Sequence, residues 1–247
     1  RVRIVGLCDA DEARIGGKDK AKGQHVDMRE MLYRDDIDAV VIATCNHWHS
    51  LAAIWACQAG KHVYVEKPIS HNVFEGRKVV EAARKYDRIV QVGTQSRSHI
   101  GWQELRQLID KGTYGKVKVV RGFCIKRRKS IGKVSGAQEP PATVDFNLYQ
   151  GPAPLAPLKR GRFHYDWHWQ WATGNGDIGN QGIHQVDICR WMAGYDRAPN
   201  RVISYGGRFA YDDDGETPNT QSTVLDYGNG QAPIVFEVRG LPAEITD

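Results

Sequence analysis

Residues 2–93 alternate short apolar runs with helical stretches, and this alternation constrains the fold more than any other feature. Strands that alternate with helices predict βαβ units and a parallel sheet with right-handed crossovers. The run Ala39–Thr44 is apolar almost throughout, which is typical of a strand buried on both faces. Further strands are expected over Val2–Asp9, His62–Val65 and Ile89–Gly93.

Two helices are expected between these strands. Ser50 is a candidate N-cap for the first, and Gly60 is expected to end it. The second runs from about Val73 to Tyr86 and carries its apolar residues at helical spacing.

The pattern changes after about residue 98. A helix over Trp102–Asp110 is followed by strict alternation over residues 116–126, which indicates a strand in a sheet with two different faces. Strands are also expected over residues 201–211, 222–227 and 234–238, with a hairpin turn at Gly228–Gly230 and a long loop over residues 130–143. The prediction is an α/β chain: a parallel-sheet domain over residues 1–97, then an α+β domain with a large, mainly antiparallel open sheet over residues 98–247.

Composition excludes several classes of protein. Apolar content of 41%, charged content of 26% and a net charge of +5 are those of an ordinary globular protein. The basic cluster Lys126–Lys129 stands without any nucleic-acid motif, and no apolar run approaches the roughly 20 residues that span a bilayer. We therefore expect neither a nucleic-acid partner nor a membrane partner.

The cysteines and histidines give no sign of a metal or of a disulfide framework. The five cysteines are scattered, without a CxxC pair. The pairs His47/His49 and His164/His168 have chelating spacings but lack a convincing third ligand, so no metal site is expected. Unpaired cysteines suit a reducing compartment, which favours a cytoplasmic location and leaves export to the periplasm open.

Three successive strand ends carry residues of the type that binds ligands: Asp9, the turn Thr44–His49, and Glu66-Lys67-Pro68. In an open α/β sheet, ligands bind beyond the carboxyl ends of the strands. A desolvated lysine loses its proton readily, so Lys67 is a candidate acid or base. The alternative is that Lys67 is a solvated charge and Asp9 an ordinary turn former.

An aromatic segment, residues 164–171, precedes a glycine-rich stretch that leads to Asn180, His184 and Asp187. Aromatic rings interleaved with hydrogen-bonding groups suit a sugar or cyclitol, although a tryptophan-rich core patch would look the same. A helix would place Asn180, His184 and Asp187, at i, i+4 and i+7, on one face.

Three motifs, in this order, make the chain resemble the Gfo/Idh/MocA family of oxidoreductases. They are Ala43-Thr44-x-Asn46-His47-x-His49, Glu66-Lys67-Pro68, and the segment Gly176–Asp187 with Gly182-Ile183-His184. The resemblance implies a Rossmann domain that binds NAD(P), a C-terminal domain with an open sheet, and an active site between the two.

The resemblance also implies roles for individual residues. Lys67 and His184 are the expected catalytic lysine and histidine, and Asp9 is the expected ribose-binding acid, which favours NAD over NADP. The expected cofactor-binding residues are Asp9, Thr44, Asn46, His49, Glu66, Lys67 and Pro68. The expected substrate-binding residues are Lys67, Trp167, His168, Asn180, His184 and Asp187. A homodimer or homotetramer through the C-terminal sheet is also implied.

The chain departs from the family pattern in three ways. Asn180 stands where the family has an aspartate; it is still expected at the catalytic site, but it orients a hydroxyl and carries no proton. Cys45 replaces a common proline. The first strand and its glycine-rich loop are missing from the sequence, and Gly16-Gly17, which follows Asp9, cannot supply that loop. We therefore expect a fragment truncated at both ends.

The predicted function is an NAD-dependent oxidoreductase that transfers hydride between a nicotinamide and a secondary alcohol of a sugar, sugar derivative or cyclitol. One alternative is a glycosidase that recycles NAD, cleaving a glycosidic bond by oxidation and elimination. The other is a non-catalytic protein that binds cofactor or sugar. The identity and stereochemistry of the substrate are not readable from the residues.

Overall fold

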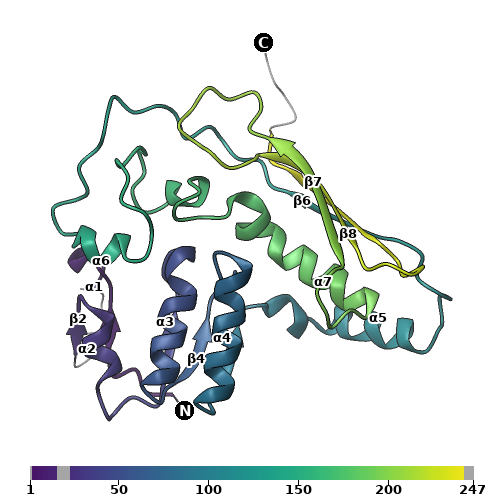
Figure 1. Ribbon diagram of the computed structural model, residues 1–247, viewed down its shortest axis with the longest axis horizontal. Coiled ribbons are helices and arrows are strands. Elements are labelled where there is room, and N and C mark those ends of the chain that lie inside the picture. Colours follow the sequence, from purple (N-terminus) through teal and green to yellow (C-terminus); the bar gives the residue numbers. More distant parts are fainter. Residues whose placement is uncertain (1, 16–22, 242–247) are drawn as a thin grey trace. The chain divides into compact units, whose positions relative to one another are not determined.

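The computed structural model describes residues 2–15 and 23–241, which form two compact units (Figure 1). The first unit contains the described residues among 1–93, together with 133–167 and 172–174. The second contains residues 94–132 and 168–171 and the described residues from 175 onward. Gly16 and Gly17 lie outside the described residues. The first unit thus includes a long segment, 133–167, from the second half of the chain.

The first unit is built on parallel strands, as the alternation of strands and helices predicts. Strands β1 and β2 pair in parallel, and a second parallel sheet has the order β3-β4-β5. The helices and strands of the first unit are β1 (Leu7–Cys8), α1 (Glu12–Ile15), β2 (Gln24–His25), α2 (Met28–Leu32), β3 (Ala39–Ile42), α3 (Asn46–Gln58), β4 (His62–Val65), α4 (Val73–Lys85), β5 (Val90–Val92) and α6 (Phe146–Gln150).

The core of this unit lies between one face of the β3-β4-β5 sheet and helices α3 and α4. Val63 and Val65 of β4 pack with Ala53 and Ala56 of α3 and with Val79 of α4, all nearly inaccessible to solvent. The alanines of α3 allow the helix to approach the sheet closely. Figure 1 shows α3 and α4 side by side next to β4.

The expectation that the run Ala39–Thr44 is buried on both faces is wrong. Val40 and Ile42 are buried, but Ala39 is exposed and the side chain of Val41 is 73% exposed. The reason is that α3 and α4 cover only the face of the sheet that carries Val40 and Ile42, and no described helix packs on the other face.

The expected helix cap at Ser50 is also wrong. Helix α3 begins at Asn46, after the extended residue Cys45. Ser50 is therefore inside the helix, where it is 1% exposed and its hydroxyl donates a hydrogen bond to the carbonyl of Ile69. The other end of α3 follows the prediction, because Gly60 directly after the C-cap has a φ of 78°.

The second unit contains a four-stranded sheet with the order β6-β9-β8-β7. Strands β6 and β9 are parallel and the other two pairs are antiparallel, which confirms the predicted, mostly antiparallel sheet. Gly228, Asn229 and Gly230 all have positive φ angles in the predicted turn between β8 and β9. The helices and strands of the second unit are η1 (Gln95–Ser98), α5 (Ile100–Asp110), β6 (Val120–Ile125), the π-helical turn η3 (Ile178–Gly182), α7 (Ile183–Ala193), β7 (Arg201–Gly207), β8 (Thr220–Asp226) and β9 (Ile234–Arg239). A 3₁₀ turn, η2, covers Asp166–Trp169.

The two faces of this sheet differ. On one face Cys124, Phe236 and Val238 are buried against η3 and α7, and Figure 1 shows α7 beside the strands. On the other face Tyr205 is 81% exposed and Ile203 54% exposed. Of the helices in the described residues, none is long and apolar enough to cross a membrane.

Candidate functional site

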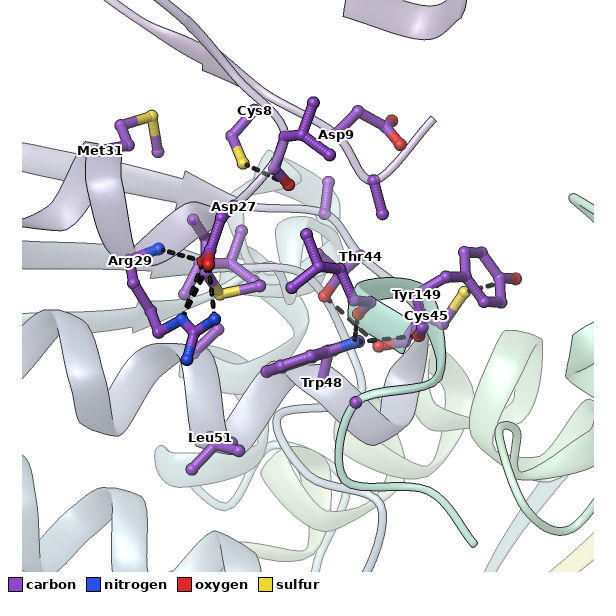
Figure 2. Close-up of a pocket in the computed structure, with 18 of the residues that line it drawn as sticks. Cys8, Asp9, Asp27, Arg29, Met31, Thr44, Cys45, Trp48, Leu51 and Tyr149 are labelled. Atoms are coloured by element: carbon purple, nitrogen blue, oxygen red, sulfur yellow. Dashed lines mark hydrogen bonds and ion pairs between the residues drawn. The ribbon is translucent and has the colours of Figure 1, made fainter. Parts of the chain in front are cut away.

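A cavity of about 790 Å³ lies in the first unit, at the carboxyl ends of β1 and β3 (Figure 2). From the strand ends, the cavity extends along the space between β1 and β3, which do not pair with each other. Pockets of this size commonly hold small molecules or cofactors. Strand ends, α2, the first turns of α3 and the segment around α6 all contribute to its wall: Cys8, Asp9, Ala10, Arg14, Val26–Arg29, Met31, Leu32, Val40–Cys45, Trp48, Leu51, Ala52, Trp55, Asn147–Tyr149, Gly151, Pro152, His164 and Trp167.

Three predicted site residues meet at this cavity: Asp9, Thr44 and Trp167. Asp9 follows β1 directly, and one of its carboxylate oxygens accepts a hydrogen bond from the main-chain N–H of Asp11 at 2.9 Å. Thr44 follows β3 and is exposed. The ends of β1 and β3 therefore present a carboxylate and a hydroxyl to the same cavity. That a ligand binds beyond these strand ends stays a prediction.

Trp48 forms part of the wall and is the largest apolar group at the start of α3. Its indole N–H donates to the carbonyls of Leu148 and Tyr149, at 3.0 Å each. Its ring meets that of Trp55 edge to face at 5.7 Å. The tryptophan thereby joins α3 to α6, and Figure 2 shows its ring directed along the cavity.

Cys45 and Tyr149 form a polar contact beside Trp48, with the sulfur 3.1 Å from the phenol oxygen. Burial raises the pKa of the Cys45 thiol to about 11 and also raises the pKa of Tyr149. Because a thiol with such a pKa stays protonated at neutral pH, Cys45 is a poor nucleophile and its role is one of packing.

Asp27 and Arg29 form an ion pair at another edge of the cavity. The guanidinium Nε lies 2.9 and 3.0 Å from the two carboxylate oxygens of Asp27, which also accepts from the Arg29 main-chain N–H as the N-cap of α2. The hydrogen bond from the Arg29 side chain lowers the pKa of Asp27. This edge of the cavity is therefore charged but locally neutralised.

Asn46 and His49, predicted as cofactor-binding residues, are buried in the first turn of α3, with 3% and 1% of their surface exposed. The two ring nitrogens of His49 lie 2.6 Å from the carbonyl oxygen of Pro68 and 2.9 Å from that of Thr44. Neither Asn46 nor His49 lines the cavity. The contacts of His49 support a role in holding the loops at the ends of β3 and β4.

Glu66, Lys67 and Pro68 follow β4 in the same unit but do not line the cavity. Pro68 is buried, and Glu66 and Lys67 are half-buried. The main-chain N–H of Lys67 donates to the Glu66 carboxylate at 3.2 Å. Because a Cβ on Gly93 would lie 3.0 Å from that carboxylate, glycine leaves room for the Glu66 side chain at the end of the neighbouring strand.

The remaining predicted residues, His168, Asn180, His184 and Asp187, belong to the second unit and are half-buried. The prediction of one regular helix through Asn180, His184 and Asp187 is wrong. Asn180 lies in the π-helical turn η3, and α7 begins only at Ile183. Such turns are rare in proteins and occur frequently at functional sites.

Asp187 already has a strong partner. Arg97 donates two hydrogen bonds to its carboxylate, both at 2.7 Å, and the guanidinium lies 5.4 Å from the centre of the Trp191 ring. A bidentate pair of this kind fixes α7 to the η1 turn. Among the described residues, no group of three or more His, Cys, Asp or Glu side chains is close enough to hold a metal ion.

Sequence reasoning missed Trp48, Tyr149 and Asp11 as site residues. Trp48 stands inside the Asn46–His49 motif, but its apolar side chain gives no chemical signal of a functional site. Tyr149 belongs to α6, whose N-cap Asp145 accepts from the Leu148 N–H, and an aspartate before an apolar stretch is a readable helix signal. Asp11 directly precedes α1 and accepts from the main-chain N–H of Ala13, which is a readable helix signal, but nothing local marks its contacts with Thr143 and His164, more than a hundred residues away.

Family models match both parts of the chain. The model described as "Oxidoreductase family, NAD-binding Rossmann fold" matches residues 1–94, and the model of the "GFO/IDH/MocA C-terminal domain" matches residues 143–238. The chain belongs to the Gfo/Idh/MocA family. The three motifs quoted above thus stand in a genuine member of this family, and the parallel strands of the first unit are those of its Rossmann fold.

The curated relatives that this chain resembles include proteins named as dehydrogenases. Inositol 2-dehydrogenase 2 of Saccharopolyspora erythraea is 28% identical over 196 residues, which is 78% of this chain and 46% of the relative. A 1-carboxy-3-chloro-3,4-dihydroxycyclohexa-1,5-diene dehydrogenase of Comamonas testosteroni is 26% identical over 241 residues, 95% of this chain and 51% of the relative. The chain therefore spans about half the length of these curated relatives.

The solved structures agree on the fold. The WlbA dehydrogenase of Bordetella pertussis, in complex with NADH and UDP-GlcNAcA, superposes with a TM-score of 0.75 at 23% identity. The match covers 98% of this chain and 65% of that structure. At this identity the similarity establishes the two-part fold alone.

Proposed function

We propose that the protein is an NAD-dependent oxidoreductase that transfers hydride between the nicotinamide and a secondary alcohol of a sugar, sugar derivative or cyclitol. The observation that carries the proposal is the placement of Asp9. It stands at the carboxyl end of a parallel strand, lines a large cavity with Thr44, and belongs to a chain that matches the NAD-binding Rossmann model. The names of the relatives point to the same chemistry.

The cavity fits the adenosine half of NAD. The carboxylate of Asp9 is an acceptor for ribose hydroxyls, and its charge repels a 2′-phosphate, which favours NAD over NADP. Apolar groups of Trp48, Leu51 and Met31 line the same space and suit the faces of an adenine ring. Bound NAD supplies the acceptor for the hydride.

Lys67 and His184 are the proposed proton-handling residues. One accepts the proton of the reacting hydroxyl, and the other stabilises the negative charge that develops on the oxygen. Lys67 suits either task because it is half-buried at a strand end, and His184 stands in the first turn of α7. Asn180 orients a hydroxyl without taking a proton, so proton transfer depends on the lysine and the histidine.

A cyclic polyol is the proposed substrate. Inositol 2-dehydrogenases among the relatives act on such a compound by name, and one structural neighbour holds a sugar nucleotide. Trp167 and His168 are proposed to contact the ring of the substrate; Asn180, His184 and Asp187 are proposed to bind its hydroxyls, since C–H faces pack on aromatic rings and hydroxyls need polar partners.

The test is turnover by the full-length protein with NAD⁺ and a panel of inositols, hexoses and sugar nucleotides, followed by NADH absorbance. Lys67→Ala should lower kcat by a factor on the order of 10² to 10⁴, the usual contribution of general acid–base catalysis. Lys78→Ala is the matched control, because Lys78 lies on the surface of α4 paired with Glu81. Near-full turnover by Lys67→Ala would refute the assignment. Release of a free sugar with no net NADH would instead identify oxidation followed by elimination.

The open face of the β6-β9-β8-β7 sheet is the proposed surface for pairing with a second copy. The register aligns Phe123, Glu237, Ser222 and Tyr205 in one row across that face. Exposed apolar groups on such a face favour association. Light scattering should show a dimer or tetramer for the wild type and a smaller species for Tyr205→Glu. An unchanged mass for the variant would place the interface elsewhere.

A further inference from the structure

The carboxylate of Asp11 is buried beside the cavity and accepts several hydrogen bonds, although Asp11 does not line the cavity. Only 4% of the residue is exposed. One oxygen accepts from the hydroxyl of Thr143 at 2.6 Å and from the main-chain N–H of Ala13 at 3.0 Å. The other lies 2.8 Å from Nε2 of His164. The Thr143 hydrogen bond, assisted by those of Ala13 and His164, outweighs burial and lowers the pKa of Asp11. The side chain is therefore ionised and fixed in place.

The main chain of Asp11 acts on Asp9. Its N–H donates to Oδ1 of Asp9 at 2.9 Å, which fixes the rotamer of the proposed ribose-binding acid. The side chain of Asp9 is short, so one charge-assisted hydrogen bond from a fixed N–H restricts its conformation strongly. The orientation of Asp9 thus depends on where the backbone of residue 11 is held.

That backbone is held by a segment far along the chain. Asp11 forms an antiparallel bridge with Val144, and the N–H of Glu12 donates to the carbonyl of Thr143 at 3.0 Å. The N–H of Asp145 donates to the carbonyl of Ala10 at 2.8 Å. Residues 10–12 are therefore clamped by residues 143–145 through both main chain and side chain.

We propose that Asp11 is a positioning residue for the cofactor, which holds Asp9 toward the ribose through its clamp on Thr143 and His164. The inference rests on the proposed function, because it assigns a task to Asp9 in NAD binding. It adds that the segment 143–164 sets cofactor preference without contacting the 2′ position. An acceptor in a fixed position binds a hydroxyl better than a mobile one, because less conformational entropy is lost on binding.

The experiment measures the dissociation constants of NAD and NADP by calorimetry in the full-length protein. Four forms are compared: the wild type, Asp9→Ala, Asp11→Ala and the double variant. Asp11→Ala should weaken NAD about tenfold, while NADP changes by less than about twofold, so discrimination falls. In the double variant the loss should not exceed that of Asp9→Ala, because the two residues act through one contact. Additive losses, or equal losses for NAD and NADP, would overturn the inference.

Thr143 keeps the test informative if Asp11→Ala fails to fold. Thr143 is exposed, so Thr143→Val removes its hydroxyl with little change to the fold. This variant should lose part of the preference for NAD, and Thr143→Ser, which keeps the hydroxyl, should restore it. Equal preference in both variants would contradict the clamp.

Asp213→Asn is the control for a general loss of stability. Asp213 is a similarly buried carboxylate in the second unit, so its variant should leave the NAD/NADP ratio unchanged. A wild type that binds neither dinucleotide would refute the proposed function itself, whereas NAD binding that depends on Asp9 but not on Asp11 would refute only this inference.

Discussion

The imidazole of His49 lies between the carbonyl groups of Pro68 and Thr44, at 2.6 Å from one and 2.9 Å from the other. It thereby connects the end of β3 with the turn that carries Lys67. Burial lowers the pKa of His49, so the ring is neutral at physiological pH. A neutral imidazole carries one N–H and donates to only one of the two carbonyls.

His49→Ala should lower the free energy of unfolding by about 2–4 kcal/mol, because it removes a buried ring and leaves one of the two carbonyls without its donor. His49→Gln, which keeps a donor, should recover part of this loss. Urea unfolding of the three forms measures the effect. A loss below about 0.5 kcal/mol for the alanine variant, within the range of surface substitutions, would show that the ring does not hold the two loops together.

Acid should destabilise the first unit through His47. Burial lowers its pKa from 6.5 to about 4, and its ring nitrogens face the carbonyls of Tyr149 and Thr173. Because the folded pKa is depressed, the unfolded chain binds the proton first. The contribution of His47 to the free energy of unfolding is fully present above pH 6.5. It is lost as the pH drops toward 4, by roughly 3 kcal/mol in all. Urea unfolding at several pH values in this range should show that the free energy of unfolding depends less steeply on pH in His47→Gln than in the wild type. An equal dependence on pH in both proteins would contradict the prediction.

Gly151→Ala should disturb the contact between α6 and Trp48. A Cβ at this position would lie 2.0 Å from the indole, and the φ of 47° is already unfavourable for alanine. We expect a loss of about 1–3 kcal/mol and a changed tryptophan fluorescence. Gly161→Ala is the control, since nothing lies within 4 Å of its added Cβ. Similar melting temperatures for the two variants would contradict the packing argument.

Asp213→Asn should destabilise the second unit by about 3–5 kcal/mol, because Arg208 loses the charge that it contacts with two nitrogens. Burial raises the pKa of Asp213, but hydrogen bonds from Arg208, Ile131, Ser130 and Gly215 outweigh it and hold the pKa below its usual value. The stabilisation that ionised Asp213 gives to the second unit is therefore present above about pH 3.9, and it is lost as the pH falls below that value. Thermal unfolding in this acid range should depend less on pH in the variant, and an unchanged dependence would refute the assignment.

A double-mutant cycle over Arg97 and Asp187 separates structure from substrate binding. The bidentate contact predicts a coupling energy of about 0.5–3 kcal/mol in unfolding experiments. If Asp187 also binds the substrate, Asp187→Asn raises KM more than Arg97→Gln does. Equal effects on KM would limit Asp187 to the ion pair.

The sequence by itself determined the order of strands and helices, the parallel and antiparallel sheets, and the residues that stand at strand ends. These features follow from local periodicity and turn chemistry, which each segment carries in its own residues. Asp9 and Thr44 were found in this way, because each stands at the carboxyl end of a predicted strand. The structure places β1 and β3 in separate sheets and both residues at one cavity. The motifs that carry the family resemblance are short contiguous runs of residues, so they too were visible in the sequence.

Only the tertiary structure decided what surrounds those residues. Cys45 meets Tyr149, and Asp11 meets Thr143, across more than a hundred residues of chain. No local pattern encodes such pairs, because they form when a distant segment packs against a surface created by other elements. The same reasoning explains Val41, whose exposure depends on which face of its strand a helix covers rather than on its own apolar character.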